Sequence, residues 1–260
     1  MSATGGPSRW VDPGPGTSEP DAAASELTTA VVLARGLGTR MKRSSAASGL
    51  SDEQRAAADA GAKAMMPTGG RPFLDFLLSA LADAGITDVC LVIGPEHDAV
   101  RAYYDRLEPE RLRIGYAVQE RPLGTADAVL AAEAFVGDRR FAAVNGDNLY
   151  PAEALEALAS VGGNALAGFD RAALDRLGNI PAERMAAFAI VESADGWLRR
   201  IVEKPSPEVV AAAGEHALIS MNCWAFTPAV FDACRRIAPS PRGEFEIVDA
   251  AGALVGAGHP

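Results

Sequence analysis

The chain has 260 residues, of which 48% are hydrophobic, so it can bury one substantial core and does not require two domains. Its formal net charge of −10 excludes a broadly basic surface, and we therefore expect neither nucleic acid nor a membrane surface as a partner. The cysteines predict no disulfide framework and no zinc site, because they are odd in number and widely spaced in apolar stretches: Cys90, Cys223 and Cys234. With no apolar run of membrane-spanning length, these features indicate a cytoplasmic protein.

The N-terminal part of the chain divides into a leader and the start of a folded domain. Residues 1–26 are rich in Pro, Gly, Ser and acids, and we expect a disordered leader followed by one domain over 27–260. Residues 30–34 form an apolar, β-branched run that predicts a buried parallel strand. The polar, alanine-rich insert that follows Arg43 and ends at Lys63 is interpreted either as a mobile flap or as a plain surface insertion.

Strand-like and helix-like stretches then alternate, which is typical of a mostly parallel sheet covered by helices on both faces. The expected helices are 72–84, stopped by Gly85, and 126–135; the expected strands are 89–93, 114–118 and 141–144. The histidines have neither metal-ligand nor triad spacing, and we expect them at the surface: His97, His216 and His259.

The second half of the chain predicts antiparallel strands beside the parallel ones. Residues 187–191 and 197–202 flank Asp195-Gly196, a dipeptide that favours a tight hairpin. A further strand is expected over 219–226, and a helix over 228–237 with proline in its first turn. The predicted fold class is therefore α/β, with a mostly parallel but mixed central sheet.

The turn after the first strand carries glycines and cations, which suit a phosphate-binding loop. Gly36 and Gly38 allow successive N–H groups to point at an anion, and a helix from Thr39 would add its N-terminal partial charge beside Arg40. The loop is not a P-loop and lacks the third glycine of the dinucleotide fingerprint. An ordinary basic strand-to-helix turn is the alternative.

Five short motifs, in one order, resemble those of the sugar-1-phosphate nucleotidyltransferases of the glucose-1-phosphate uridylyl- and thymidylyltransferase kind. They are Leu33-Ala34-Arg35-Gly36-Leu37-Gly38-Thr39-Arg40-Met41, Lys63-Ala64-Met65-Met66-Pro67, Pro122-Leu123-Gly124-Thr125-Ala126, Gly146-Asp147 and Glu203-Lys204-Pro205. The resemblance covers about residues 28–250 and implies the Rossmann-like fold of nucleotide-diphospho-sugar transferases.

The resemblance also implies roles for individual residues at the phosphate end of a site. Leu33 and the Gly36, Gly38 and Thr39 backbone would bind the nucleotide, and Arg40 and Lys63 would be catalytic, holding phosphate. Asp147 would bind Mg²⁺, since a hard carboxylate suits that ion. The alternative for Asp147 is a helix cap or a turn residue.

Base and sugar recognition are implied by three further segments. Gln119, Pro122, Gly124 and Thr125 match the base-recognition loop, where an amide that donates and accepts would read a pyrimidine edge. Glu203 and Asn222 match sugar-binding residues, and Lys204 matches a catalytic residue that binds the sugar phosphate; a surface ion pair is the alternative for Glu203-Lys204. Residues 243–249 match a helix start beside the family's site.

The chain departs from the family pattern at two places. Arg35 stands where a small residue is commoner, which we expect to add charge beside the phosphates. The sequence ends at Pro260, before the strand that carries a second metal carboxylate, so we expect the domain to lack its C-terminal strand and helix. An apolar face would then be partly uncovered near Ile247, Val248 and Leu254.

The resemblance implies a Mg²⁺-dependent enzyme that joins an NTP, with UTP or dTTP favoured, to a sugar 1-phosphate and releases pyrophosphate. One alternative is a guanylyl- or cytidylyltransferase acting on another phosphorylated substrate, and a second is a non-catalytic nucleotide-sugar sensor. The absence of G-x-G-x-x-G disfavours a dinucleotide oxidoreductase. A homo-oligomer remains open.

Overall fold

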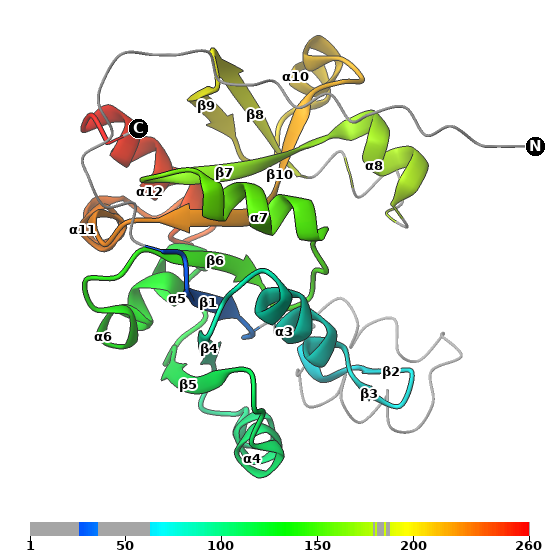
Figure 1. The fold of residues 1–260 in the computed structure, drawn as a ribbon. Coiled ribbons are helices and arrows are strands. Elements are labelled where there is room, and N and C mark those ends of the chain that lie inside the picture. Colours follow the sequence, from blue (N-terminus) through cyan, green and yellow to red (C-terminus); the bar gives the residue numbers. More distant parts are fainter. Residues whose placement is uncertain (1–25, 36–62, 179, 181–184, 186–187, 260) are drawn as a thin grey trace, which may run out of the picture.

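The computed structural model describes residues 26–35, 63–178, 180, 185 and 188–259 (Figure 1). The predicted phosphate-loop residues Gly36, Gly38, Thr39 and Arg40, nearly all of the leader, and the insert up to residue 62 lie outside the described residues. Within the described part, the main sheet has the strand order β5-β4-β1-β6-β10-β8-β9, and β7 also pairs with β10.

The first half of this sheet is parallel. It consists of β1 (Thr29–Leu33), β4 (Asp88–Ile93), β5 (Arg113–Val118) and β6 (Phe141–Asn145). β1 lies between β4 and β6, with Leu33 opposite Val92 on one side and Asn145 on the other. The chain order reverses direction across β1, and open α/β sheets collect ligands at such a switch point, beyond the carboxyl ends of the strands.

The second half is antiparallel and is organised around β10 (Leu218–Phe226). The other strands are β7 (Ala165–Asp170), β8 (Ala189–Ala194) and β9 (Trp197–Val202). The end of β10 pairs with β6 and its beginning with β8, and its register with β7 shifts between Ser220 and Trp224. Asn222 lies within this irregularity with a φ of 54°, a left-handed conformation that asparagine tolerates better than most residues.

Helices cover both faces of the sheet (Figure 1). One core packs Ala30 and Val32 against α3 (Phe73–Asp83), α4 (Asp98–Leu107) and α7 (Ala152–Ser160). The other packs Val31 against α5 (Thr125–Ala131), α6 (Glu133–Val136), α11 (Ala229–Arg236) and α12 (Ile247–Gly256). Because successive strand residues point to opposite faces, the uninterrupted apolar run of β1 supplies both cores.

The remaining short elements lie around this framework. They are η1 (Lys63–Met65), β2 (Pro67–Thr68), β3 (Arg71–Pro72), α8 (Arg171–Leu177) and α10 (Pro207–Ala213). In the described part of the chain, no helix combines the length and apolar composition needed to cross a bilayer.

The mixed sheet with helices on both faces is confirmed, whereas three local expectations are wrong. The helix expected over 126–135 is two helices, because Ala132 adopts ψ −1° and its N–H donates to Val129. His97 was expected at the surface, but it is only 2% exposed, and its Nδ1 accepts the Gly94 N–H at 3.3 Å.

The third wrong expectation concerns the last helix. Ile247, Val248 and Leu254 were expected to be partly uncovered, but they are 2%, 5% and 3% exposed. All three belong to the core that α12 forms with α5 and α11.

Candidate active site

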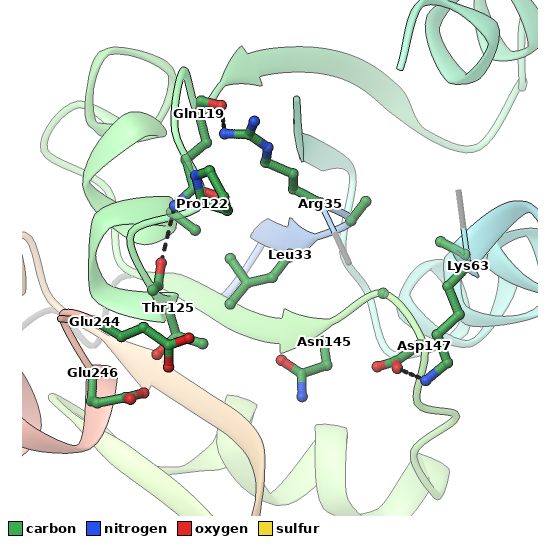
Figure 2. Close-up of a pocket in the computed structure, with 15 residues that line it drawn as sticks. Leu33, Arg35, Lys63, Gln119, Pro122, Thr125, Asn145, Asp147, Glu244 and Glu246 are labelled. Carbon is green, nitrogen blue, oxygen red and sulfur yellow. Dashed lines mark hydrogen bonds and ion pairs between the residues drawn. The ribbon is translucent and has the colours of Figure 1, made fainter. Parts of the chain in front are cut away.

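A cavity of about 320 Å³ opens at the carboxyl edge of the parallel strands (Figure 2). Backbone hydrogen bonds continue beyond the strands and align the loops there: Ala34 N–H donates to Val92, Gly146 N–H to Leu33, and Gln119 N–H to Ile93, each at 2.9 Å. The cavity is lined by Leu33, Ala34, Arg35, Lys63, Ala64, Gln119, Pro122, Gly124, Thr125, Ala128, Asn145, Gly146, Asp147, Glu244 and Glu246.

Lys63 and Asp147 form an ion pair at one end of this pocket (Figure 2). Lys63 begins η1, and Asp147 follows the buried strand β6 and the glycine at 146, so two segments 84 residues apart are joined at the carboxyl edge. The side chains are 32% and 36% exposed, so both can be reached by a ligand. The pair places a cation and a hard carboxylate at the same end of the cavity.

Gln119 lies at the opposite wall and is only 5% exposed. Its Nε2 donates to the Gly124 carbonyl oxygen at 3.0 Å and to Asp127 Oδ2 at 2.7 Å. A primary amide nitrogen carries two hydrogens, and both are therefore used within the chain. This differs from the expectation that the amide both donates to and accepts from a base.

Gly124 and Thr125 connect the pocket wall to the start of α12. Gly124 has a φ of 116°, and a Cβ there would lie 2.4 Å from the Phe245 carbonyl oxygen, so a close backbone approach requires glycine. The Phe245 N–H donates to Leu123 at 2.7 Å, and the Ala126 N–H donates to Phe245 at 2.9 Å. Thr125 Oγ1 accepts the Ile247 N–H at 2.8 Å, which satisfies an unpaired donor at the helix start.

Arg35 holds three loops of the carboxyl edge together. Its guanidinium pairs with both Glu96 carboxylate oxygens, at 3.2 and 3.3 Å, and donates to the Gln119 backbone carbonyl. The side chain is 7% exposed. The charge that Arg35 was expected to add beside the phosphates is paired with Glu96 instead.

The ion pair also affects the titration of Glu96. Partial burial raises the pKa of that carboxyl. Hydrogen bonds from its own backbone N–H and from Arg35 together lower the pKa by more than burial raises it, so the net pKa lies below the usual range.

Acidic side chains gather where α12 meets the pocket. Arg242 donates a hydrogen bond to Glu246 and forms an ion pair with Glu244 Oε2 at 3.1 Å. Burial and the charges of Glu203 and Glu244 raise the pKa of Glu246, against the opposing effect of Arg242. The pKa of Glu203 is also raised, first by loss of hydration and then by Asp249 and Glu244.

Asn222 is fixed by contacts within the sheet and does not line the cavity. Its Oδ1 accepts the Trp224 indole N–H at 3.3 Å. The buried Tyr150 hydroxyl connects this irregularity with the end of β6: it accepts the Asn145 N–H at 3.1 Å and lies 2.9 Å from the Met221 carbonyl oxygen. Tyr150 therefore fastens the loop that carries Asp147 to the middle of β10.

The structure brings most of the described predicted residues together. Those that line the cavity are Leu33, Lys63, Gln119, Pro122, Gly124, Thr125 and Asp147. Glu203, Lys204 and Asn222 do not line it, although Glu203 is close enough to Glu244 and Arg242 for their charges to shift its pKa. Lys204 is exposed with a φ of 45°.

The lining residues that were not predicted as site residues are Ala34, Arg35, Ala64, Ala128, Asn145, Gly146, Glu244 and Glu246, of which Asn145 and the two glutamates bring polar side chains that the sequence analysis gave no role. The Asn145 side chain points into the cavity between Leu33 and Asp147 (Figure 2). Their signal was present in the sequence, since Asn145 precedes Gly146-Asp147 and the glutamates surround the helix start at 243–249.

The donor set fits a magnesium ion that is held partly by substrate. Among the described residues, no group of three or more His, Cys, Asp or Glu side chains could enclose a metal. Asp147 offers an accessible carboxylate beside Lys63. Mg²⁺ commonly binds one or two carboxylates together with substrate phosphates and waters, so a single carboxylate at an open pocket is compatible with it.

Comparisons with known proteins agree with this fold. The chain is 31% identical over 234 residues to a glucose-1-phosphate thymidylyltransferase of Streptomyces griseus, a match that covers 88% of this chain and 58% of that protein. It is 28% identical to the UTP–glucose-1-phosphate uridylyltransferase AglF of Haloferax volcanii, over 88% of this chain and 84% of that protein. A crystal structure of UDP-glucose pyrophosphorylase complexed with UDP-glucose matches with a TM-score of 0.68 at 18% identity, covering 89% of this chain and 88% of that one.

The chain spans little more than half the length of several relatives, including a second thymidylyltransferase, from Streptomyces antibioticus, that is 34% identical over 85% of this chain and 55% of its own length. The family model described as nucleotidyl transferase matches residues 29–260. That match includes the whole described sheet and every segment that lines the cavity, and the chain therefore belongs to the nucleotidyl transferase family.

Proposed function

We propose that this protein transfers a nucleotidyl group from UTP or dTTP to a sugar 1-phosphate and releases pyrophosphate. The observation that carries the proposal is the composition of one cavity, which has Gln119 and Gly124 at one wall and Lys63 with Asp147 at the other end. The relatives named above act on glucose 1-phosphate, so glucose 1-phosphate is the first acceptor to test.

The proposed chemistry is an in-line displacement at the α-phosphorus by a sugar phosphate oxygen. Such reactions depend on positioning and charge neutralisation more than on a protein nucleophile. Lys63 neutralises phosphate charge beside the reacting centre, and Asp147 holds Mg²⁺, which supplies further charge neutralisation when bound. Arg40, which lies outside the described residues, is assigned to the triphosphate together with the Gly36, Gly38 and Thr39 backbone.

Sugar 1-phosphate binding is assigned to Glu203, Lys204 and Asn222. Two observations support this assignment. Glu203 is close enough to Glu244, which lines the pocket, for that charge to shift its pKa, and Tyr150 connects Asn222 with the loop that carries Asp147. A lysine next to the sugar phosphate supplies a point charge that can follow the oxygen as it attacks.

The test is pyrophosphate release measured with UTP, dTTP, CTP, GTP and ATP, each with glucose 1-phosphate, galactose 1-phosphate or mannose 1-phosphate, in the presence of Mg²⁺. We expect release with UTP or dTTP that requires the sugar phosphate. Release with CTP or GTP alone would favour the cytidylyl- or guanylyltransferase alternative. Nucleotide binding without release under any of these conditions would instead indicate a sensor.

A further inference from the structure

Gln119 is held at both of its ends by the surrounding chain. The Arg35 guanidinium, itself fixed by Glu96, donates to the Gln119 backbone carbonyl. At the other end of the residue, Nε2 donates to the Gly124 carbonyl at 3.0 Å and to Asp127 Oδ2 at 2.7 Å, and Figure 2 shows the side chain running along the pocket wall toward Thr125.

The chemistry of these partners fixes the direction of the amide. A backbone carbonyl oxygen and a carboxylate oxygen only accept hydrogen bonds. A flipped amide would place Oε1 against two acceptor oxygens and remove both Nε2 hydrogen bonds in a wall where Gln119 is 5% exposed, although the Gly124 carbonyl would keep the Ala128 N–H at 3.1 Å. The nitrogen must therefore face Asp127 and Gly124.

This direction decides what Gln119 can offer to a ligand. Both Nε2 hydrogens are used, and in the described part of the chain no donor reaches Oε1. The amide atom left for a ligand in the cavity is therefore an acceptor. A ring N–H, as in uracil and thymine, meets that acceptor favourably, whereas cytosine presents a lone pair at the same ring position.

We propose that Asp127 is a positioning residue for base selection: it orients the Gln119 amide so that Oε1 faces the base and selects nucleotides with a ring N–H. This rests on the proposed function for the identity of the ligand. Asp127 also lies in the first turn of α5, where a negative charge stabilises a helix start, so the experiment must separate orientation from stability.

The experiment measures the affinities of UTP and CTP by isothermal titration calorimetry, without sugar phosphate, for the native chain and for Asp127→Asn. The native chain should bind UTP at least tenfold more tightly than CTP, since one hydrogen bond is exchanged for a repulsive contact. Asparagine can donate to Oε1 as well as accept from Nε2, so only the Gly124 carbonyl still favours the original direction and the amide flips at a lower cost. We expect the ratio of UTP to CTP affinity to fall roughly tenfold, with no loss of CTP binding.

Glu120→Gln is the matched control, because it removes a neighbouring carboxylate that is exposed and does not contact the amide. It should leave the ratio unchanged. An equal loss of UTP and CTP affinity in Asp127→Asn would overturn the proposal and leave Asp127 as a helix-stabilising residue. So would a native chain that binds both nucleotides equally.

Failure of the proposed function would be seen separately. If UTP binds selectively but no sugar 1-phosphate supports pyrophosphate release, the transferase assignment is wrong and the role of Asp127 stands. If no nucleotide binds at all, both are wrong.

Discussion

The position of Asp147 is determined by the strand and the glycine that precede it. β6 is buried up to Val144, and the Gly146 N–H donates to Leu33, so the residue after the glycine must leave the sheet at the switch point. There it meets Lys63, and the two charges compensate each other within the cavity. Under the proposed function, an incoming phosphate would attract Lys63 and release the Asp147 carboxylate, so phosphate binding would expose the proposed metal ligand.

Asp147→Asn should therefore reduce turnover about 100-fold or more, since it removes the charge of the only carboxylate in this ion pair while preserving its shape. The melting temperature should change little, because the side chain is 36% exposed and an exposed ion pair contributes about 0–1 kcal/mol. Pyrophosphate release and thermal unfolding together check the expectation. Asp138→Asn, an exposed residue at the opposite edge of β6, is the control; near-native release from Asp147→Asn would contradict the assignment.

Glu246 predicts how stability depends on pH. Burial and neighbouring acids raise its pKa above the ordinary glutamate value of 4.5, so the folded state binds this proton more tightly than the unfolded state. For a carboxyl with a raised pKa, the stability contribution is greatest below about 4.5 and is lost as the pH rises through the folded pKa.

A glutamine at position 246 cannot ionise, so Glu246→Gln removes this loss of stability with rising pH. Relative to the native chain, the variant should gain stability as the pH rises from 4 to 7, as followed by thermal unfolding at several pH values. Arg242 retains Glu244 at 3.1 Å as a partner, so the variant should still fold. A pH-independent difference between the two proteins would contradict the pKa direction; Glu120→Gln, which is exposed, serves as control.

At the scale of elements, the turn before α5 and the segment before α12 act as one unit. Leu123, Ala126 and Thr125 exchange hydrogen bonds with Phe245 and Ile247, so the wall that carries the predicted base-recognition residues depends on the position of α12. Any side chain at residue 124 would separate them.

Gly124→Ala should destabilise the fold by about 2–5 kcal/mol, since it combines a strained backbone with overpacking against Phe245. Gly85→Ala is a matched control: it also has a positive φ, 92°, but a Cβ there meets nothing within 4 Å. That control should lose only about 1–2 kcal/mol. Denaturant unfolding measures both, and equal losses would show that the contact with Phe245 is unimportant.

Tyr150 links the parallel and antiparallel halves of the sheet through one buried hydroxyl. Tyr150→Phe leaves the Asn145 N–H and the Met221 carbonyl without this partner, which should reduce stability by about 1–3 kcal/mol. Because the same hydroxyl positions the Asp147 loop and Asn222, the KM for sugar 1-phosphate should also rise.

Tyr103→Phe is the control for Tyr150→Phe. Its hydroxyl donates to Asp75 at 3.0 Å, between α3 and α4, and its removal should affect stability without changing KM. If both variants show the same kinetics, Tyr150 has no positioning role.

The elements that could be predicted are those whose pattern is local. The apolar runs of β1, β4 and β6 and the Asp195-Gly196 hairpin, with φ values of 55° and 79°, have their causes within a few residues. The break at Ala132 could not be predicted, because an alanine-rich stretch has no local signal for ending a helix.

The same distinction between local and long-range causes applies to the residues of the site. The motifs predict several of the residues that line the pocket, among them Lys63, Gln119 and Asp147, but the predicted sugar-binding residues do not line it. The sequence could not predict that Arg35 pairs with Glu96, 61 residues away, or that Thr125 contacts Ile247, 122 residues away. These long-range hydrogen bonds depend on which strands are neighbours, and they decide which donors and acceptors remain for a ligand.

At the scale of the whole molecule, the cavity draws on segments from both halves of the chain. β1, η1, the turn between β5 and α5, α5 itself and β6 each supply lining residues, and Glu244 and Glu246 come from the segment before α12. A ligand that contacts all of them connects segments that otherwise meet mainly through the sheet. Nucleotide binding should therefore stabilise the entire fold cooperatively.

This gives a prediction for UTP or dTTP added with Mg²⁺ at about 100 times the dissociation constant. The stabilisation should be about 2.7 kcal/mol, or a rise in melting temperature of roughly 5–10 °C for a domain of this size. Uridine and tripolyphosphate, each added alone at the same concentration, should give smaller shifts, because each occupies only one end of a cavity whose base wall and ion pair lie apart. A tripolyphosphate shift equal to that of UTP would show that the Gln119 wall does not contribute to binding, and the base-recognition assignment would then have to be abandoned while the phosphate end stood.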